Sequence, residues 1–237
     1  MTTLSVEIVI ESRDPYGLAI DVAFDVPPGV TVLFGPSGAG KSRTLGCIAG
    51  LARPDRGRIA LGEDVWFDSR TALPIHRRRV AYVFQSLALF PHMTAAENVA
   101  YGMAADMPKD ARRTLASSML AKMQVAHLAE RRPRTFSGGE AQRVALARAF
   151  AMRPRVVLLD EPFSALDFGL KTELLLVVAR ELAEEKVPVL LVTHQPEDAR
   201  VLGDRVVFID EGRVKRTAPM SDDPFTDRAP SLSARTE

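Results

Sequence analysis

The sequence has 237 residues, a formal net charge of +1, 46% hydrophobic residues and 26% charged residues. This composition is typical of a globular protein, and a nearly neutral chain gives no electrostatic reason to expect a nucleic-acid partner. No apolar run approaches the roughly 20 residues that span a bilayer, and the N-terminal residues lack the pattern of a secretory signal. We therefore expect a chain that stays in the cytoplasm and binds its ligands at local sites.

Alternating and continuous apolar runs predict a sheet. Residues 4–11 and 18–26 alternate apolar and polar residues, which predicts two half-buried strands in an antiparallel hairpin. Residues 29–34 are apolar throughout and lead into a glycine-rich loop, which is typical of a buried parallel strand. Four later runs are also short and apolar and end at a polar residue, and we expect them in the same sheet: residues 79–84, 155–160, 188–194 and 205–210.

Two segments have helical spacing. Between residues 86 and 155 the apolar pattern becomes helical, which predicts a helical insertion between sheet strands. Residues 169–186 place Leu174, Val178 and Leu182 on one face and charges on the other, so this helix should connect two strands across a face of the sheet. The expected fold class is α/β, with a mainly parallel core, an N-terminal antiparallel β subdomain and a helical insertion.

These patterns divide the chain into three parts. The core is expected from residues 1–85 and 156–215, with the helical subdomain at residues 86–155. Residues 216–237 are rich in Pro, Ser and Asp, which predicts a flexible tail. The single cysteine, Cys47, lies in an apolar stretch, and we interpret it as a packed residue without chemistry.

The loop after the first parallel strand matches the pattern G-x-x-x-x-G-K-[ST] of a phosphate-binding loop. Its glycines let the backbone wrap a phosphate, the next helix N-terminus supplies positive potential, and Lys41 adds a full charge. Ser42 offers a hydroxyl to Mg²⁺. The alternative is a glycine turn that only opens a helix. The residues expected at the phosphates are Gly35, Pro36, Ser37, Gly38, Ala39, Gly40, Lys41, Ser42 and Arg43.

Two adjacent carboxylates follow a later buried strand. Asp160 and Glu161 stand where the run VVLLD ends. Asp160 can orient the shell of a Mg²⁺ ion, and Glu161 can polarise an attacking water. A strand followed by two acids is common, but with the phosphate loop upstream it favours a nucleotide-hydrolysing site.

A second anion-binding pattern lies at residues 135–150. Two adjacent glycines are an unfavourable way to begin a helix unless a ligand approaches them. Ser137 can cap the helix, Gly138 and Gly139 expose backbone N–H groups, and the helix from about Glu140 points its positive end at the same place. Because the chain already has a phosphate loop, this second site is best explained if it serves a nucleotide held by another copy of the chain.

Taken in order, these motifs resemble those of the ATP-binding cassette (ABC) ATPases, whose signature loop usually reads LSGGQ. The resemblance covers residues 4–215. It implies a P-loop NTPase fold, binding of ATP and Mg²⁺, ATP hydrolysis, and a head-to-tail dimer with each ATP between two chains. The implied contacts to the partner's ATP are Ser137, Gly138, Gly139, Glu140 and Asp167.

The resemblance also assigns roles to residues that are weak signals alone. Gln85 matches the metal-sensing glutamine, Ser164 to Asp167 match the D-loop, and His194 matches the switch histidine. The implied catalytic residues are Glu161, His194 and Gln85. The implied Mg²⁺-site residues are Ser42, Gln85 and Asp160.

Three positions depart from the family pattern or match it weakly. Tyr16 lies where the family stacks an aromatic ring on adenine, although a turn tyrosine at the surface is the alternative. Arg43 stands where the family usually has Thr, with Thr44 one place later, which puts a hydroxyl contact to the inner phosphates in doubt. Glu140 replaces the commoner glutamine, and its negative charge favours the helix but opposes bound phosphate.

An apolar segment beside Gln85 indicates the partner. Leu87, Leu89, Phe90 and Met93 follow it directly, and packing within the insertion is the alternative reading. In the family this segment receives a helix of a membrane permease. The resemblance therefore implies an importer subunit on the cytoplasmic face of the membrane, with permease subunits and an extracytoplasmic solute-binding protein as partners.

The motifs are closest to those of molybdate-type importers, and sulfate, phosphonate, iron or polyamine import are alternatives. Molybdate-type relatives often carry a further C-terminal β domain, which is not in this sequence. A non-transport cassette ATPase acting on ribosomes or in DNA repair is the rival reading, but such proteins usually hold two cassettes or a long coiled coil. A non-hydrolysing scaffold is disfavoured because Glu161 and His194 are both present.

Overall fold

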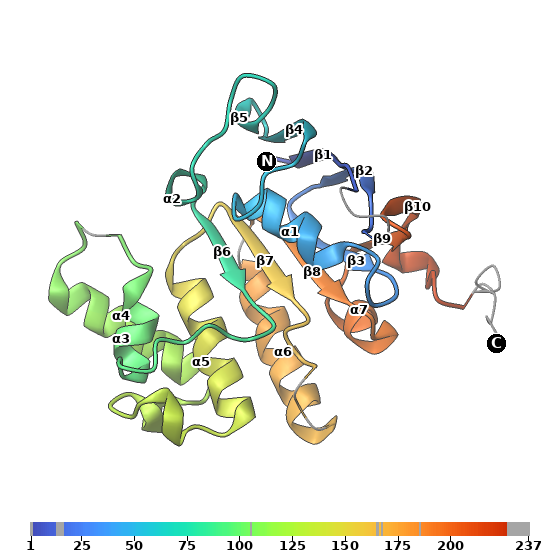
Figure 1. Cartoon of the computed structure of the whole chain (residues 1–237). Coiled ribbons are helices and arrows are strands. Elements are labelled where there is room, and N and C mark those ends of the chain that lie inside the picture. Colours follow the sequence, from blue (N-terminus) through green and yellow to red (C-terminus); the bar gives the residue numbers. More distant parts are fainter. Residues whose placement is uncertain are drawn as a thin grey trace.

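The computed structural model describes residues 2–12, 17–104, 106–164, 166, 168–184 and 186–226. Within them one sheet has the strand order β5-β4-β1-β2-β10-β9-β3-β8-β7-β6, with helices packed against it (Figure 1). The strands are β1 (Leu4–Ile10), β2 (Ile20–Val26), β3 (Gly29–Phe34), β4 (Arg56–Leu61), β5 (Asp64–Phe67), β6 (Val80–Val83), β7 (Val156–Asp160), β8 (Pro188–Thr193), β9 (Arg205–Asp210) and β10 (Arg213–Pro219). The predicted α/β class is confirmed.

The core of the sheet is parallel. β3 pairs with β8 and β9, β7 pairs with β8, and β6 pairs with β7, all in the parallel sense. Side chains alternate between two apolar clusters on opposite faces, with Val157 and Leu159 in one and Val156 and Leu158 in the other. Because both faces are covered, these strands are apolar throughout rather than alternating.

The N-terminal strands form the antiparallel part. β1 pairs with β2 along its length, with Leu4 opposite Val26 and Ile10 opposite Ile20, so the predicted hairpin is confirmed. β4 pairs with the other edge of β1, and β5 pairs with β4. The sequence patterns predicted neither of these two strands, and the last three residues of β4 are all buried, which breaks the expected alternation.

Helices cover both faces and extend beside the sheet. They are α1 (Lys41–Ala49), α2 (Ile75–Arg78), α3 (Ala95–Tyr101), α4 (Lys109–Lys122), α5 (Gly138–Ala151), α6 (Phe168–Glu184) and α7 (Pro196–Leu202). α3, α4 and α5 lie together beside the parallel strands (Figure 1). Leu174, Val178 and Leu182 of α6 are buried in the cluster on one face, as predicted. Among the described residues, no helix is long and apolar enough to cross a membrane.

The structure differs from the expected tail at its start. β10 runs to Pro219 and pairs with β9, so residues past 216 belong to the sheet. Arg216 donates to the carbonyl of Pro224 (2.6 Å), and its guanidinium lies 4.3 Å from the centre of the Phe208 ring. Phe225 packs edge-on against Phe34 and Phe208. These contacts hold residues 216–226 to the core, and residues 227–237 lie outside the described structure.

We predict that the single cysteine is unreactive in the folded chain. Cys47 is fully buried in α1, and burial raises the pKa of its thiol to about 11 because the thiolate would lose its hydration. At pH 8 the thiol is therefore both inaccessible and protonated. A disulfide reagent such as DTNB should label it slowly in the native protein and fast after unfolding in guanidinium. Fast labelling of native protein would contradict this packing.

Candidate functional site

The phosphate loop lies where three parallel strands end. In the sheet Phe34 is opposite Thr193 and Asp160 is opposite Val192, so β3, β8 and β7 end side by side. Residues 35–40 leave β3 at this edge and turn into α1. Gly40, with φ of 97°, is the N-cap of α1. A side chain at Gly35 would collide with the carbonyl of Ile209, so the packing of the loop requires glycine there.

Lys41 is folded back onto the loop. Its Nζ donates to the carbonyls of Gly35 (2.8 Å) and Pro36 (2.7 Å), and the residue is 5% exposed. Burial lowers the pKa of Lys41, while the nearby carboxylates of Glu161 and Asp160 act in the opposite direction. The lysine thus fills the concave side of the loop with positive charge in the way that a phosphate-binding loop requires.

Asp160 is held by two hydroxyl groups. Ser42 Oγ donates to its Oδ1 (3.0 Å) and Tyr82 Oη to its Oδ2 (3.2 Å). Burial raises the pKa of Asp160, and these two hydrogen bonds partly offset that effect. A hydroxyl and a carboxylate in contact are hard oxygen donors, so the residues present fit a Mg²⁺ ion that keeps waters and takes phosphate oxygens as its other ligands.

Glu161 and His194 form the polar pair next to this site. His194 Nδ1 lies 3.1 Å from Glu161 Oε1, and the backbone N–H of Glu161 donates to the carbonyl of Val192 (3.0 Å). Glu161 has a φ of 46°, the left-handed region that side chains other than glycine rarely adopt. This backbone aims the carboxylate away from the strand and toward the end of β8, where His194 begins the next loop.

Gln85 lies at the same end of the sheet. It follows β6, which runs parallel to β7, so the loop that carries Gln85 leaves the sheet near Asp160. Its side chain is exposed. The structure therefore places Gln85, Asp160, Glu161 and His194 at the carboxyl ends of neighbouring strands.

The second anion-binding pattern begins α5. Ser137 is the N-cap, and its Oγ accepts from the N–H of Glu140 (3.3 Å) while Glu140 Oε2 accepts from the N–H of Ser137 (2.7 Å). His127 Nε2 lies 3.1 Å from the other carboxylate oxygen. The hydrogen bond from the Ser137 backbone, and then the one from His127, lower the pKa of Glu140. The carboxylate thus turns back to cap its own helix, which limits its opposition to a bound phosphate.

The described residues give no structural reason for glycine at position 138. A Cβ there would meet none of their atoms within 4 Å, and the φ of Gly138 is not in the left-handed region. Alanine is favoured over glycine in a helix. The space in front of Gly138 is therefore open to a ligand from outside the chain.

Arg43 and its neighbour Thr44 contact the backbone of the chain itself. Arg43 Nη1 donates to the carbonyl of Leu18 (3.3 Å), which ties α1 to the segment just before β2, and Thr44 Oγ1 donates to the carbonyl of Gly40 (3.0 Å). Tyr16 and Asp167 lie outside the described residues. The assignments of these two residues stay predictions.

The structure adds residues that sequence reasoning missed. Tyr82 contacts Asp160, His127 contacts Glu140, and Arg148 donates to two carbonyls just after Gln85. Tyr82 lies inside a strand pattern that indicates only burial, and His127 is separated from Glu140 by 13 positions, with no spacing rule that links them. Arg148 lies on the same helix as Ser137, but only the fold shows what it reaches.

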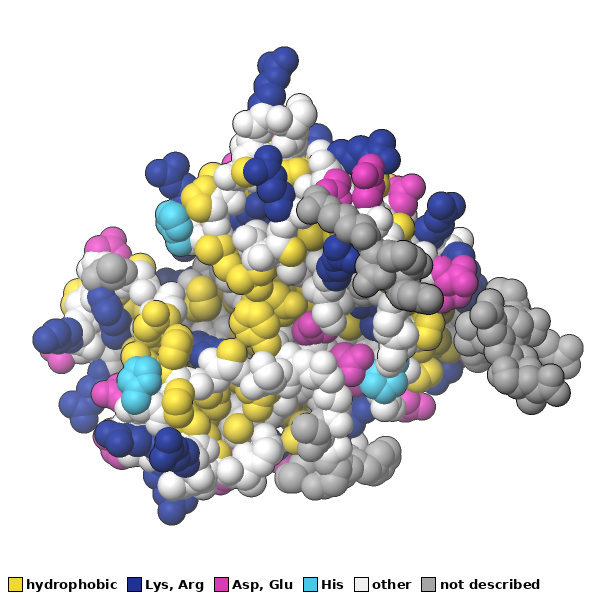
Figure 2. All heavy atoms as spheres, viewed as in Figure 1, with side chains coloured by type: hydrophobic (Ala, Val, Ile, Leu, Met, Phe, Trp, Pro, Cys, Tyr) yellow, Lys and Arg dark blue, Asp and Glu magenta, His cyan; other side chains and the backbone are white. Residues whose placement is uncertain are grey.

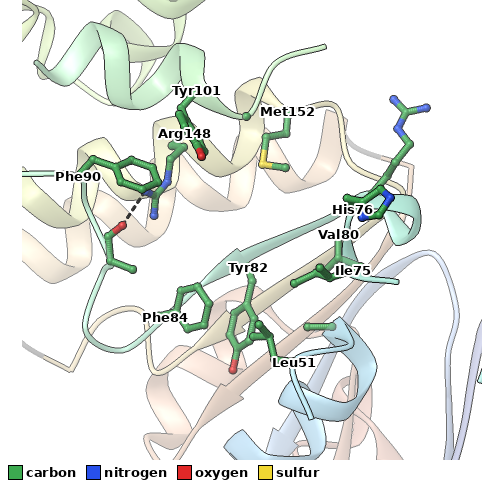
Figure 3. Close-up of a pocket in the computed structure, with 14 residues that line it drawn as sticks. Leu51, Ile75, His76, Val80, Tyr82, Phe84, Phe90, Tyr101, Arg148 and Met152 are labelled. Atoms are coloured by element: carbon green, nitrogen blue, oxygen red, sulfur yellow. Dashed lines mark hydrogen bonds between the residues drawn. The ribbon is translucent and has the colours of Figure 1, made fainter. Parts of the chain in front are cut away.

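An apolar groove lies between the sheet and the helical part (Figures 2 and 3). Its volume is about 420 Å³. Three large apolar side chains at its walls are well exposed, Leu51 (53%), Ile75 (45%) and Tyr101 (60%). Of the predicted apolar segment, Phe90 lines the groove, whereas Leu87 and Leu89 pack against the core. Phe90 is thus available to a partner, as a docking surface requires, whereas Leu87 and Leu89 contribute to internal packing.

Known proteins resemble this chain in sequence and fold. Residues 20–164 match the family model described as ABC transporter. The molybdenum import ATP-binding protein ModC of Thiobacillus denitrificans is 44% identical over 207 residues, which is 87% of this chain and 57% of that protein. The Fe(3+) ions import ATP-binding protein FbpC of Pseudomonas fluorescens is 42% identical over 222 residues, which is 93% of this chain and 62% of that protein.

A solved structure agrees with the sequence matches. The dimeric structure of MJ0796, a bacterial ABC transporter cassette, superposes with a TM-score of 0.79 at 27% identity, covering 92% of this chain and 98% of that one. The chain spans about three fifths of the length of the curated relatives it matches, 57% and 62% of the two described here. Family model, relatives and fold agree, and the chain belongs to the ABC transporter family of ATP-binding cassettes.

Proposed function

We propose that this chain is the ATP-hydrolysing subunit of an ABC importer. The observation that carries the proposal is the meeting of the Lys41 loop, the Ser42–Asp160 contact and the Glu161–His194 pair at one edge of the sheet. This set contains a phosphate cradle, a place for a metal ion and a base with an orienting partner. The relatives' names, which are those of import ATP-binding proteins, support the transport role.

In the proposed reaction each side chain has one task. Lys41 exchanges the carbonyls of Gly35 and Pro36 for phosphate oxygens, and Glu161 accepts hydrogen bonds from the attacking water. His194 holds the Glu161 carboxylate in orientation and reaches the γ-phosphate. Mg²⁺, held at Ser42, Asp160 and Gln85, would neutralise charge on the phosphates.

The second half of each site comes from another copy. The capped N-terminus of α5, with Ser137, Gly138 and Gly139, presents N–H groups to an anion, and the two glycines add no side chain there. The dimeric form of the MJ0796 cassette supports a dimer of this chain. In this dimer two ATP molecules lie between the Lys41 loop of one chain and the α5 N-terminus of the other, with Asp167 beside them.

The groove is the proposed docking place of the permease on the cytoplasmic face of the membrane. It is apolar, exposed, and bounded by both the sheet and the helical part, so a segment lying in it contacts both. Molybdate is the proposed cargo because several relatives import molybdenum. Sulfate, phosphonate, iron or polyamine import are the alternatives, and the relative named as an Fe(3+) ions import protein supports iron. An extracytoplasmic solute-binding protein is the proposed partner that delivers the cargo to the permease.

The first prediction separates binding from hydrolysis. Glu161→Gln should bind ATP, lower hydrolysis by about 100-fold or more because the base is lost, and accumulate as a dimer. Lys41→Ala should instead weaken ATP binding by about 10- to 100-fold, because a charge-assisted contact is lost. Light scattering with and without ATP measures the dimer. A Glu161→Gln chain that stays monomeric at saturating ATP would contradict the shared site.

The second prediction tests the α5 N-terminus. Gly138→Ala fills a space that the chain leaves open, so the thermal midpoint should stay the same or rise. Hydrolysis should nevertheless fall about tenfold or more, since the methyl group would occupy the place of a phosphate. Gly46→Ala in α1 is the matched control, because its Cβ would make only an ordinary 3.8 Å contact with Ala52. Full activity of Gly138→Ala would remove this residue from the site.

The third prediction tests the groove. Tyr101→Glu places a charge at its apolar wall and should prevent recovery of a multi-span permease with tagged chain from gently solubilised membranes. Leu176→Glu is the matched control, an equally exposed apolar residue (55%) on α6 that does not line the groove. Mass spectrometry identifies the partner. Equal recovery by both variants would place permease binding elsewhere, and recovery of soluble partners alone would favour a non-transport cassette.

A further inference from the structure

Arg148 of α5 forms two hydrogen bonds with the loop that follows Gln85. Its Nη1 donates to the carbonyl of Ala88 (2.8 Å) and its Nη2 to the carbonyl of Leu87 (2.8 Å). Figure 3 shows the guanidinium beside Phe90, and its centre lies 5.7 Å from the centre of that ring. A planar guanidinium presents donors in a fixed fork, so two neighbouring carbonyls fix both its position and its plane.

The two residues whose carbonyls accept from Arg148 have an unusual backbone conformation. Leu87 has a φ of 61° and Ala88 a φ of 45°, in the left-handed region. Such conformations persist in residues other than glycine only where the surroundings hold them. Two consecutive residues of this kind turn their carbonyls to the same arginine, so the Arg148 contacts account for the shape of the loop.

A second fixed point lies three residues further. The amide of the fully buried Asn98 side chain in α3 accepts from the N–H of Phe90 (2.8 Å) and donates to its carbonyl (3.2 Å). The segment from Leu87 to Phe90 is therefore attached to the helices on both sides. Gln85 stands at the boundary between this attached segment and the strand β6.

The helix that carries Arg148 also begins with the second anion-binding pattern. Arg148 lies about 16 Å along the helix from Ser137, at 1.5 Å per residue. An uninterrupted helix transmits displacement along its axis over this length. In the proposed dimer the N-terminus of α5 contacts the ATP held by the partner chain. The loop that Arg148 contacts follows Gln85, which belongs to the chain's own ATP site.

We propose that Arg148 is a positioning residue that makes Gln85 and the Ser137–Gly139 loop move as one unit, and thereby couples the two nucleotide sites of the dimer. This inference rests on the proposed function. ATP bound at the α5 N-terminus of one chain then sets the position of Gln85 at that chain's own phosphate loop. Coupling of this kind gives a sigmoidal dependence of hydrolysis on ATP concentration.

The test compares the unmodified chain with Arg148→Met, which keeps an apolar stem, and Arg148→Lys, which keeps one charge without the fork. Arg112→Lys in α4 is the matched control, because Arg112 Nε also donates to a backbone carbonyl, that of Met107 (2.9 Å), away from Gln85. Two readouts are taken. One is hydrogen exchange of the Leu87 and Ala88 amides without nucleotide, and the other is the ATP dependence of hydrolysis.

In both Arg148 variants the amides of Leu87 and Ala88 should exchange at least about tenfold faster, because the paired hydrogen bonds from the guanidinium to the loop are lost. Their Hill coefficient should fall to about 1 and kcat about tenfold, with ATP binding to the Lys41 loop changed less than about threefold. Arg112→Lys should match the wild type in all respects. Arg148→Lys provides the measurement if Arg148→Met does not fold.

Two results would overturn the inference, namely unchanged loop exchange in a folded Arg148 variant, or an unchanged Hill coefficient despite faster exchange. A wild-type chain with a Hill coefficient of 1 would also overturn it, because there would be no coupling to lose. If the wild type hydrolysed no ATP, the proposed function would fail instead, and exchange of the loop amides would still show whether Arg148 holds the loop.

Discussion

The parallel register of β3, β8 and β7 is the constraint on which the site depends. Parallel strands end at the same edge of a sheet, and this register sets Phe34 beside Thr193 and Asp160 beside Val192. The residue after each strand end then emerges at one place, although the three segments are far apart in sequence. A shift of one residue in any of these pairings would exchange the side chains of a strand between the two apolar clusters, where they would meet neighbours of the wrong size and shape. The packing of the core therefore also fixes the geometry of the site.

The buried charges of Asp160 and Lys41 are hydrogen-bonded to neutral groups of the chain itself. Asp160 and Lys41 are both nearly buried, and a buried charge is costly unless it is hydrogen-bonded. The two hydroxyls on Asp160 and the two loop carbonyls on Lys41 supply these bonds. None of these partners carries a formal charge, so phosphate and metal can replace them without breaking an ion pair.

Local patterns in the sequence predicted the buried strands and the phosphate loop. Contacts between residues far apart in the sequence were not predicted. The buried strands and the phosphate loop have patterns that can be recognised because both faces of each strand must be apolar and the loop must have glycine. The Pro, Ser and Asp content of residues 216–237 predicts a tail, but the pairing of β10 with β9 and the packing of Phe225 hold residues 216–226 to the sheet. Tyr82 and Arg148 act through contacts between distant segments. A single sequence contains no signal for such contacts.

Gly35 and Gly138 differ in what a side chain at each position would meet. At Gly35 a side chain would collide with the carbonyl of Ile209, so the fold itself requires glycine. At Gly138 there is open space and an ordinary backbone, where alanine would favour the helix. None of the described residues would meet a side chain at Gly138, and this open space supports the proposed approach of a ligand to the helix. A helix N-terminus offers backbone N–H groups and so favours an anion, which in the proposed dimer is the phosphate of the partner's ATP.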